Sequence, residues 1–364
     1  MKIALASALL LAIVTSCLSN ARNASLPPVV QASRPASPAI DSVRGSPWSS
    51  AEACASALRR GERARRGAGR ARIGTWNIRW FPDGRPGKRA SRAALDVSWI
   101  ACAIAWLDVD VLVVQEFKTL PRARERTAEI LQQLDRFTGG RWHAEFDSCP
   151  RPAGQHVGLF FNARRVTAQS FRLYGSINPH GEACRDQLRP GFGAYLRFEG
   201  GLDLHLTAVH LKSGPKRRDF ELRRRSFAGL GAALASSQAS RADADVLFAG
   251  DFNSMGCSKC SPRVSARDEL AHVDGELSSL NPPLRRIASG RECSHYFGTR
   301  PTLLDFFVAA SLAELPEDRA AEVYGPCADF ACENLDRDRA PSAFSAALSD
   351  HCPVVIELDE QDKD

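Results

Sequence analysis

Short runs of apolar residues recur along the chain, and many of them end in a carboxylate, an amide or an imidazole. Runs of this length that are rich in β-branched and aromatic residues predict buried strands. Six segments follow the pattern: 73–78, 111–116, 206–210, 246–253, 303–308 and 349–356. A polar side chain at such an end lies where a packed sheet meets solvent. Because the ends carry mostly oxygen donors and histidines, we expect them to form one site for phosphate and metal.

The segments between these runs predict helices and further strands. Apolar residues at helical spacing predict helices over 91–107, 122–137 and 219–237. Further strands are predicted over 143–147, 156–162, 166–173, 192–198, 202–211 and 353–358. Residues 256–300 are predicted to be mostly loop and 311–348 to be irregular. Helices that alternate with strands, together with hairpin-like strand pairs, predict an α/β fold with layers built on mixed sheets.

The N-terminal segment predicts export. Lys2 provides a positive end, and the apolar core from Ile3 to Val14 is too short to span a bilayer. The core runs into Val-Thr-Ser-Cys at 14–17, which resembles a bacterial lipobox, so residues 1–17 are predicted to be a signal peptide with the lipid on Cys17. The alternative is an ordinary secretory signal cleaved nearby. The mature protein is expected either lipid-anchored in the cell envelope, on its periplasmic or outer surface, or secreted.

Composition divides the rest of the chain into three predicted parts. Residues 18–71 are expected to form a flexible linker, rich in Pro, Ser and Ala and then in arginine from Arg59 onward. The arginine run could contact anionic lipid or nucleic acid, or form a solvated domain edge. One folded domain is predicted over 72–358, and 359–364 form a charged tail.

The overall composition is that of a globular protein. The 364 residues are 44% hydrophobic and 25% charged, which is enough to bury the core of a large α/β domain. A net charge of +6 permits binding to polyanions without requiring it. The chain has 11 cysteines, and outside Cys17 their even number in an exported protein predicts disulfides. The connectivity is open, and proximity alone suggests Cys149 with Cys184, and Cys257 or Cys260 with Cys293.

Glu116 is the strongest candidate for a metal ligand. It follows a run of apolar residues, where a carboxylate is costly unless it is paired or coordinated. Carboxylate oxygens suit Mg²⁺, and also Mn²⁺ or Ca²⁺. Asp350 could provide a further metal or water ligand. A salt-bridged strand end is the alternative interpretation of Glu116.

Two histidines predict acid–base chemistry at the same strand ends. His351 is a candidate general base because imidazole titrates near neutrality, and Asp305 is expected to hold its other ring nitrogen. His210 would contact the phosphate or stabilise charge on the leaving group. Asp251 and Asn253 are two residues apart at one strand end, so both can face one pocket.

The ordered motifs resemble the endonuclease/exonuclease/phosphatase superfamily, which includes pancreatic-type deoxyribonuclease. The motifs are Thr-Trp-Asn-Ile at 75–78, Gln-Glu at 115–116, Gly-Asp-Phe-Asn at 250–253, Leu-Asp at 304–305 and Ser-Asp-His at 349–351. The resemblance covers about 72–358. It implies a deoxyribonuclease-I-like fold, a four-layer α/β sandwich with two packed mixed β-sheets and the site at one edge.

The resemblance also implies a role for each motif residue. The implied catalytic residues are His351, Asp305, His210 and Asp251, the implied phosphate contacts are Asn77, Asn253 and Arg189, and the implied metal ligands are Glu116 and Asp350. Whether Asp251 or His351 takes the proton from water is open. The assignment of Arg189 as a phosphate contact rests on the loosest match. The alternative is that Arg189 is an arginine on the surface without a role in the site. The cysteine-bearing segment 255–300 is not a general feature of the family.

These features favour a metal-dependent nuclease that cleaves DNA or RNA. Basic residues follow His210 and could track a phosphate backbone, or could line a solvated helix face: Lys212, Lys216, Arg217, Arg218, Arg223, Arg224 and Arg225. We therefore expect a monomer with nucleic acid as substrate and with membrane contact through lipidated Cys17. The alternative is a phospholipid or sphingolipid phosphodiesterase or a phosphatase of the same superfamily. A third interpretation is a lipoprotein that only binds, although no catalytic residue of the set is lost.

Overall fold

Two six-stranded mixed sheets pack face to face in this computed structural model, which describes residues 46–87, 94–316 and 319–363. The first sheet has the order β13 (Glu322–Val323), β14 (Val354–Asp359), β1 (Arg70–Phe81), β2 (Val111–Phe117), β4 (His156–Asn162) and β3 (Trp142–Phe146). The second has the order β5 (Val166–Tyr174), β6 (Gly191–Phe198), β7 (Asp203–His210), β8 (Val246–Asp251), β12 (Asp305–Ala310) and β9 (Arg285–Arg286). A separate hairpin consists of β10 (His295–Phe297) and β11 (Arg300–Thr302).

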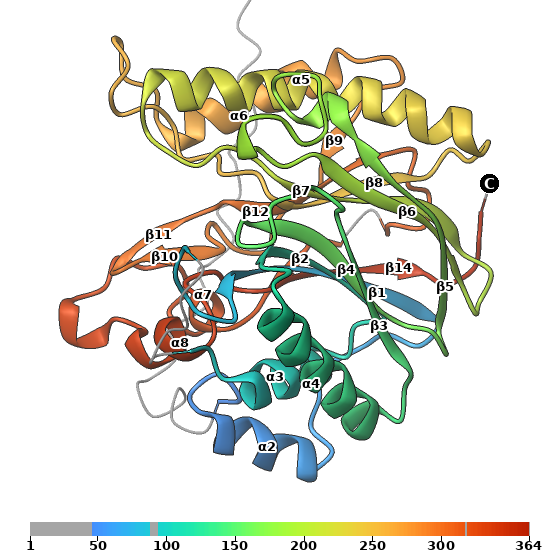
Figure 1. Cartoon of the computed structure of the whole chain (residues 1–364), viewed down its shortest axis with the longest axis vertical. Helices are drawn as coiled ribbons and strands as arrows, with labels where there is room; N and C mark the ends of the chain where they lie inside the picture. Colours follow the sequence, from blue (N-terminus) through green and yellow to red (C-terminus); the bar gives the residue numbers. More distant parts are fainter. Residues whose placement is uncertain (1–45, 88–93, 317–318, 364) are drawn as a thin grey trace, which may run out of the picture. The chain divides into compact units, whose positions relative to one another are not determined.

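Helices cover the outer faces of both sheets (Figure 1). The larger helices are α2 (Ala51–Arg59), α3 (Val97–Leu107), α4 (Pro121–Thr138), α5 (Arg217–Ser240) and α6 (Ala266–Ser278). The shorter ones are α7 (Pro326–Asp329), α8 (Ser342–Ala347) and the 3-10 turns η1 (Gly175–Ile177), η2 (Arg185–Gln187) and η3 (Arg337–Arg339). None of the helices in the described ranges is long and apolar enough to cross a membrane.

Three apolar clusters hold these layers together. The central cluster fills the space between the sheets and includes Val113 and Leu206. A second cluster packs Ile104 and the rest of α3 against the outer face of the first sheet. A third packs Phe227 of α5 against Phe248 of β8 on the outer face of the second sheet. The order helix, sheet, sheet, helix confirms the predicted four-layer α/β sandwich.

The helix predicted over 91–107 begins later, at Val97. The side chain of Asp96 accepts a hydrogen bond from the main-chain N of Trp99 (3.0 Å), so Asp96 caps the first turn. Residues 88–93 lie outside the described part of the chain, as do the predicted signal peptide with Cys17 and the linker up to residue 45.

The predicted linker is wrong in its last part, because residues 46–71 fold onto the first sheet. Trp48 is only 5% exposed and packs edge-on against Trp76 of β1, with ring centroids 6.3 Å apart. A disulfide joins Cys54 of α2 to Cys102 of α3. The composition suggested a solvated linker because the many arginines in this region outnumber the few apolar residues that pack against the sheet.

Helix α6 lies in the segment that was predicted to be mostly loop. It begins with a capping box, in which Ser265 and Asp268 each bond the other's main-chain N. Its buried residues are Glu269, Val273 and Leu277. Because this face is short and one of its members is charged, the apolar periodicity was too weak to predict the helix.

The ten cysteines from Cys54 onward form five disulfides. The predicted pair Cys149–Cys184 is confirmed. The proposed pairing of Cys293 with Cys257 or Cys260 is wrong, because Cys257 and Cys260 bond each other across a tight turn and Cys293 bonds Cys332. Cys327–Cys352 and Cys54–Cys102 complete the set.

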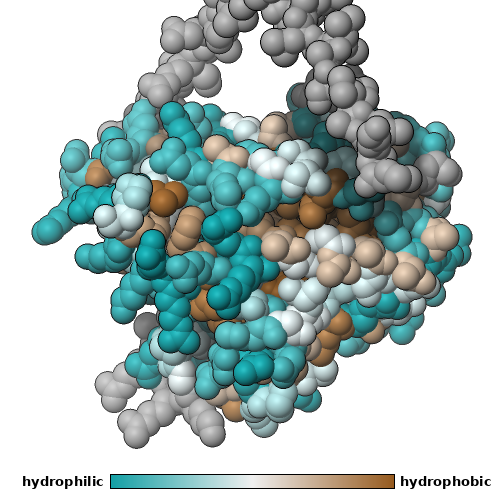
Figure 2. All heavy atoms as spheres, turned by 90° about the horizontal axis from the view of Figure 1, so that it is seen from above, coloured by the Kyte–Doolittle hydropathy of each residue, from teal (hydrophilic) through white to brown (hydrophobic). Residues whose placement is uncertain are grey.

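The basic residues after His210 do not form one continuous surface. Arg223 is fully buried, and its Nε lies 2.8 Å from Oε1 of Glu269, so it cannot contact a substrate backbone. Its guanidinium also donates to three main-chain oxygens in the loops around 212–214 and 256. Arg224 is exposed and pairs with Glu276 at 2.9 Å. Figure 2 views the protein from the α5–α6 side, where hydrophilic side chains predominate with apolar ones between them.

Candidate active site

Strand register brings the predicted site residues together at one edge of the two sheets. In the second sheet, Asp251 at the end of β8 pairs with His210 of β7 on one side and with Asp305 of β12 on the other. In the first sheet, the neighbouring strands β1 and β2 carry Asn77 and Glu116 at the same end. Nδ2 of Asn77 donates to Asp251 (2.9 Å) and to Glu116 (3.2 Å), and so links the two sheets.

The backbone at these strand ends adopts conformations that ordinary residues avoid. Glu116 and Asn253 have φ angles of 65° and 52°. A side chain at Gly250 would place its Cβ 1.9 Å from the main-chain O of Val209, so only glycine lets β8 approach β7 this closely. Such strain persists where the surrounding structure requires it, often at functional sites.

Glu116 is positioned as a metal ligand would be. Its Oε2 accepts a hydrogen bond from the main-chain N of Trp80 (3.1 Å), and its Oε1 accepts the bond from Asn77. Burial raises the pKa of Glu116, and the nearby charge of His351 opposes this rise only in part. A cation in front of the carboxylate would relieve the cost of burying its charge.

Asp251 lies at the centre of the group. Its Oδ1 accepts a hydrogen bond from the main-chain N of Asn253 (2.9 Å), and its Oδ2 lies 3.4 Å from Nε2 of His210 and 3.9 Å from Nε2 of His351. Burial raises the pKa of Asp251; the charge of His351 lowers it and that of Asp305 raises it further. Asp251 is therefore a carboxylate with unusual affinity for a proton or a cation.

His351 and Asp305 form the predicted pair. Nδ1 of His351 lies 2.8 Å from Oδ2 of Asp305, which also accepts a hydrogen bond from the Ser294 hydroxyl (2.7 Å). Burial lowers the pKa of His351, but the charges of Asp305 and Asp251 outweigh it and raise the pKa to about 10. In the absence of a metal ion, the ring is protonated at neutral pH and directs Nε2 toward Asp251.

His210 has the opposite protonation state. Burial and the charge of Arg189 lower its pKa well below the ordinary value, so its ring is neutral at pH 7. Nε2 of His210 lies 3.8 Å from Oε1 of Glu116, in addition to its approach to Asp251. A neutral imidazole beside two carboxylates can bind a metal ion or form a hydrogen bond with a phosphate oxygen.

Arg189 does not have the arrangement expected of a phosphate contact. Its Nε and Nη2 donate to the main-chain oxygens of His210 (3.0 Å) and Leu211 (2.5 Å), and its Nη1 donates to Gln155 (3.3 Å). Nδ2 of Asn253 donates to the same Leu211 oxygen (3.2 Å). Arg189 is buried behind the strand end, where its charge and hydrogen bonds support the site from the rear.

Asp350 lies apart from the other predicted metal ligand, Glu116. Its Oδ2 is 3.9 Å from Nε2 of His295 and 3.9 Å from Nε of Arg79. Burial raises the pKa of Asp350, but its contact with His295 and the charge of His351 lower it well below its ordinary value. Asp350 therefore stays ionised beside the imidazole rings, where it forms a separate group of possible metal ligands with His295 and His351.

His295 is a site residue that the sequence did not indicate. Its ring centroid lies 4.5 Å from that of His351, and β10 bridges to His351 through the backbone. No apolar pattern marks this two-stranded hairpin. The hydrogen bond from the preceding Ser294 to Asp305 forms only in the folded protein and leaves no signal in the sequence. A lone histidine in a segment predicted to be loop carried no signal by which it could be found.

The donor set fits a divalent cation. Glu116, His210 and Asp251 each offer one ligand atom, and these atoms lie within 4.8 Å of one another. Oδ1 of Asn77 is buried there without a hydrogen-bond partner among the described residues. Two carboxylates with raised pKa values, an amide oxygen and a neutral imidazole match the ligand preferences of Mg²⁺ or Mn²⁺.

The defining pattern of the Endonuclease/Exonuclease/phosphatase family matches residues 74–292. Among solved structures, a humanized D. rerio TDP2 is 17% identical, with a TM-score of 0.50 over 80% of this chain and 99% of that one. The human Nocturnin catalytic domain is 16% identical, with a TM-score of 0.50 over 79% and 93%. An endonuclease/exonuclease/phosphatase from Bacteroides vulgatus is 13% identical, with a TM-score of 0.50 over 79% and 98%. The structural likenesses support the fold alone.

No curated protein matched the sequence. The matched range contains Asn77, Glu116, His210, Asp251 and Asn253, which the fold brings to one sheet edge. On the strength of this match, which covers more than half of its length, the chain belongs to the Endonuclease/Exonuclease/phosphatase family.

Proposed function

We propose that this protein is a divalent-metal-dependent phosphodiester hydrolase, and specifically a nuclease that cleaves DNA or RNA. The observation that carries the proposal is the convergence of Glu116, Asp251 and His210 beside the His351–Asp305 pair. Carboxylates with raised pKa values next to a protonated imidazole provide opposite acid–base roles within one pocket.

Each group in the site has a place in the proposed reaction. A bound divalent cation would neutralise phosphate charge and polarise the phosphorus–oxygen bonds. Glu116 and Asp251 would hold this ion, and the amide of Asn253 would orient a phosphate oxygen. Protonated His351 is suited to form a hydrogen bond with an oxygen that gains negative charge. Asp251 would also position the attacking water, whose proton a bound cation would make more acidic.

Nucleic acid is supported as substrate by exposed positive charge in the segment that follows His210. The chain carries a net charge of +6, and Lys216, Arg217 and Arg218 are exposed at the start of α5, shortly after His210 in sequence. Exposed lysines and arginines in this position favour association with a polyanion through release of its counterions.

One observation favours a second candidate, a phospholipid or sphingolipid phosphodiesterase. Phe297 is 77% exposed in the β10–β11 hairpin, two residues beyond His295, whose ring packs against His351. An exposed aromatic residue beside a phosphodiesterase site can enter the interfacial region of a lipid bilayer.

A substrate panel separates these candidates. The mature chain would be incubated with supercoiled DNA, RNA and sphingomyelin vesicles, with Mg²⁺, Mn²⁺ or Ca²⁺ and with EDTA. We expect cleavage of DNA or RNA that requires a divalent ion and stops with EDTA. Release of phosphocholine with intact nucleic acids would favour the second candidate. Nucleic-acid cleavage that persists in EDTA would be incompatible with the proposed metal site.

We further propose that the protein is exported, carries a lipid on Cys17 and acts as a monomer at the membrane. The five disulfides support an oxidising compartment. We expect the wild-type chain in the membrane fraction and the Cys17→Ser variant to lose lipid labelling and leave that fraction. Equal labelling of both chains would contradict lipidation, and a cytoplasmic wild-type protein would contradict export.

A further inference from the structure

A groove of about 560 Å³ opens beside the metal-ligand group. Trp80 lines it on one side and the loop 149–154 on the other, with the Cys149–Cys184 disulfide in its wall. The main-chain N of Trp80 donates to Oε2 of Glu116, so the groove begins one hydrogen bond from that ligand. Gln155, which follows the loop, also interacts with Glu116. The groove therefore lies within reach of a molecule whose phosphate occupies the site.

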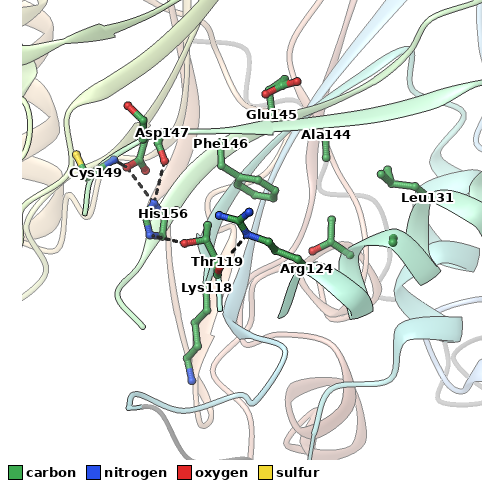
Figure 3. Close-up of a pocket in the computed structure, with 13 residues that line it drawn as sticks. Lys118, Thr119, Arg124, Leu131, Ala144, Glu145, Phe146, Asp147, Cys149 and His156 are labelled. Atoms are coloured by element: carbon green, nitrogen blue, oxygen red, sulfur yellow. Dashed lines mark hydrogen bonds and ion pairs between the residues drawn. The ribbon is translucent and has the colours of Figure 1, made fainter. Parts of the chain in front are cut away.

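The loop that forms the wall is fixed in place. Figure 3 shows its base, where Nδ1 of His156 lies 3.0 Å from Oδ1 of Asp147 and Nε2 lies 3.2 Å from Thr119. Nε2 of His156 also lies 3.0 Å from the main-chain O of Arg151. The main-chain N of Thr119 donates a hydrogen bond to the main-chain O of Pro152 (2.8 Å). With the disulfide, these bonds hold the wall in one conformation before any ligand arrives.

Arg151 provides the charge of the groove. It is the one charged residue among the described residues that line it. Its side chain is 10% exposed, and Nη1 donates to the main-chain O of Leu188 (2.7 Å). Nε and Nη2 have no hydrogen-bond partner among the described residues, since the nearest carboxylate, Asp147, is 3.8 Å from Nη2. Both nitrogens are shielded from solvent, so the burial of this charge is poorly compensated, and an anion in the groove would offset the cost.

The rest of the lining favours a flat ring over an acyl chain. Prolines, glycines, the disulfide and the Trp80 indole form the described walls, without a leucine, isoleucine, valine or methionine. Nζ of Lys118 lies 5.8 Å from the centroid of the Trp80 ring, so a buried cation supports the indole. An indole beside rigid walls provides a stacking surface for a nucleobase.

We propose that this groove binds the nucleotide next to the scissile phosphate, with its base on Trp80 and its own phosphate on Arg151. This inference rests on the proposed nuclease function and specifies how the same site would hold a strand. The occupant is a single-stranded segment of DNA or RNA, because a base inside a duplex has no free face to stack on an indole.

Binding of a fluorescent eight-nucleotide (dT) strand, measured in EDTA by anisotropy, tests the groove without turnover. Arg151→Gln should raise Kd about tenfold and reduce the slope of log Kd against log salt by about 0.7, the value for one phosphate contact on a single strand. Trp80→Leu should raise Kd about tenfold through lost stacking. Arg124→Gln is the matched control, because this arginine lines another pocket (Figure 3), to which neither Trp80 nor Arg151 contributes, and its loss should leave Kd unchanged.

The outcomes distinguish this inference from the proposed function. Hydrolysis of bis(p-nitrophenyl) phosphate by the wild type, which needs no flanking nucleotide, tests the function alone. If Arg151→Gln binds the strand as the wild type does, with the same salt slope, the groove assignment is overturned. Absence of strand binding by the wild type overturns it equally. If the variants instead weaken binding to phosphatidylglycerol vesicles and leave strand binding intact, a lipid occupies the groove and the nucleotide assignment is wrong.

Discussion

Replacing His351 with alanine should lower kcat for phosphodiester hydrolysis by about 10²–10⁴-fold, the usual effect of removing a positioned acid–base group. Nδ1 of His351 is held 2.8 Å from Asp305, so the ring cannot turn away from the site without breaking that bond. Its Nε2 lies 3.9 Å from Oδ2 of Asp251, in the pocket where the phosphate would react. The measurement is steady-state kinetics on the best substrate of the panel at saturating Mg²⁺.

The control for this variant is His272→Ala. His272 is a half-exposed histidine on α6 that lies 3.0 Å from Glu276, and its loss should leave kcat unchanged. Asp305→Asn should lower kcat less than His351→Ala does, because the ring remains but loses the carboxylate that raises its pKa. If His351→Ala retained the kcat of the wild type in a folded protein, the acid–base assignment would be wrong.

The sheet edge could be predicted because each contributing strand has its own local signal. The strand Val111–Phe117 begins with four buried apolar residues, so the carboxylate of Glu116 near its end stands out against them. Asp251 was visible for the same reason, with Gly250 before it to allow the close approach of β7. Register then follows from the sheet, since His210 and Asp305 each fall opposite Asp251.

Other features depend on contacts that no local pattern records. Arg223 and Arg224 are adjacent in sequence, yet one is fully buried against Glu269 and the other is exposed. The two arginines differ because their side chains point in different directions from α5. This direction decides their burial only because α6 packs beside α5. Arg189 likewise resembled a phosphate contact until the fold placed main-chain oxygens around its guanidinium.

The groove could not be predicted from the sequence either. Trp80 and Arg151 lie in segments without periodicity, and they line one space only because β1 ends beside the loop between β3 and β4. The pairing of Cys149 with Cys184 could be proposed from proximity, but its position in the wall of the groove could not. Substrate recognition therefore depends on loops, whereas the chemistry depends on strand ends that the sequence reveals.

Asp251→Asn should abolish most metal-dependent activity, with kcat lower by about 10³-fold, equivalent to about 4 kcal/mol of barrier. The amide keeps the shape of the side chain and can still bond Asn253, but it lacks the charge that would hold the cation beside Glu116. Isothermal titration with Mn²⁺ should show a corresponding loss of affinity. The metal-free variant should be at least as stable as the wild type, because burial raises the pKa of Asp251 and ionising it above that pKa costs folding free energy.

Stability measured with and without metal makes this prediction specific to a cation site. Saturating Mn²⁺ should raise the Tm of the wild type, since a ligand that binds only the folded state stabilises it, and should raise that of Asp251→Asn much less. Asp274→Asn is the control, because Asp274 is an exposed partner of Arg286 and its loss should leave the metal response unchanged. If Asp251→Asn gained as much in Tm from Mn²⁺ as the wild type does, the cation would have to bind elsewhere. The neighbouring group of His295, Asp350 and His351 would then be the place to test next.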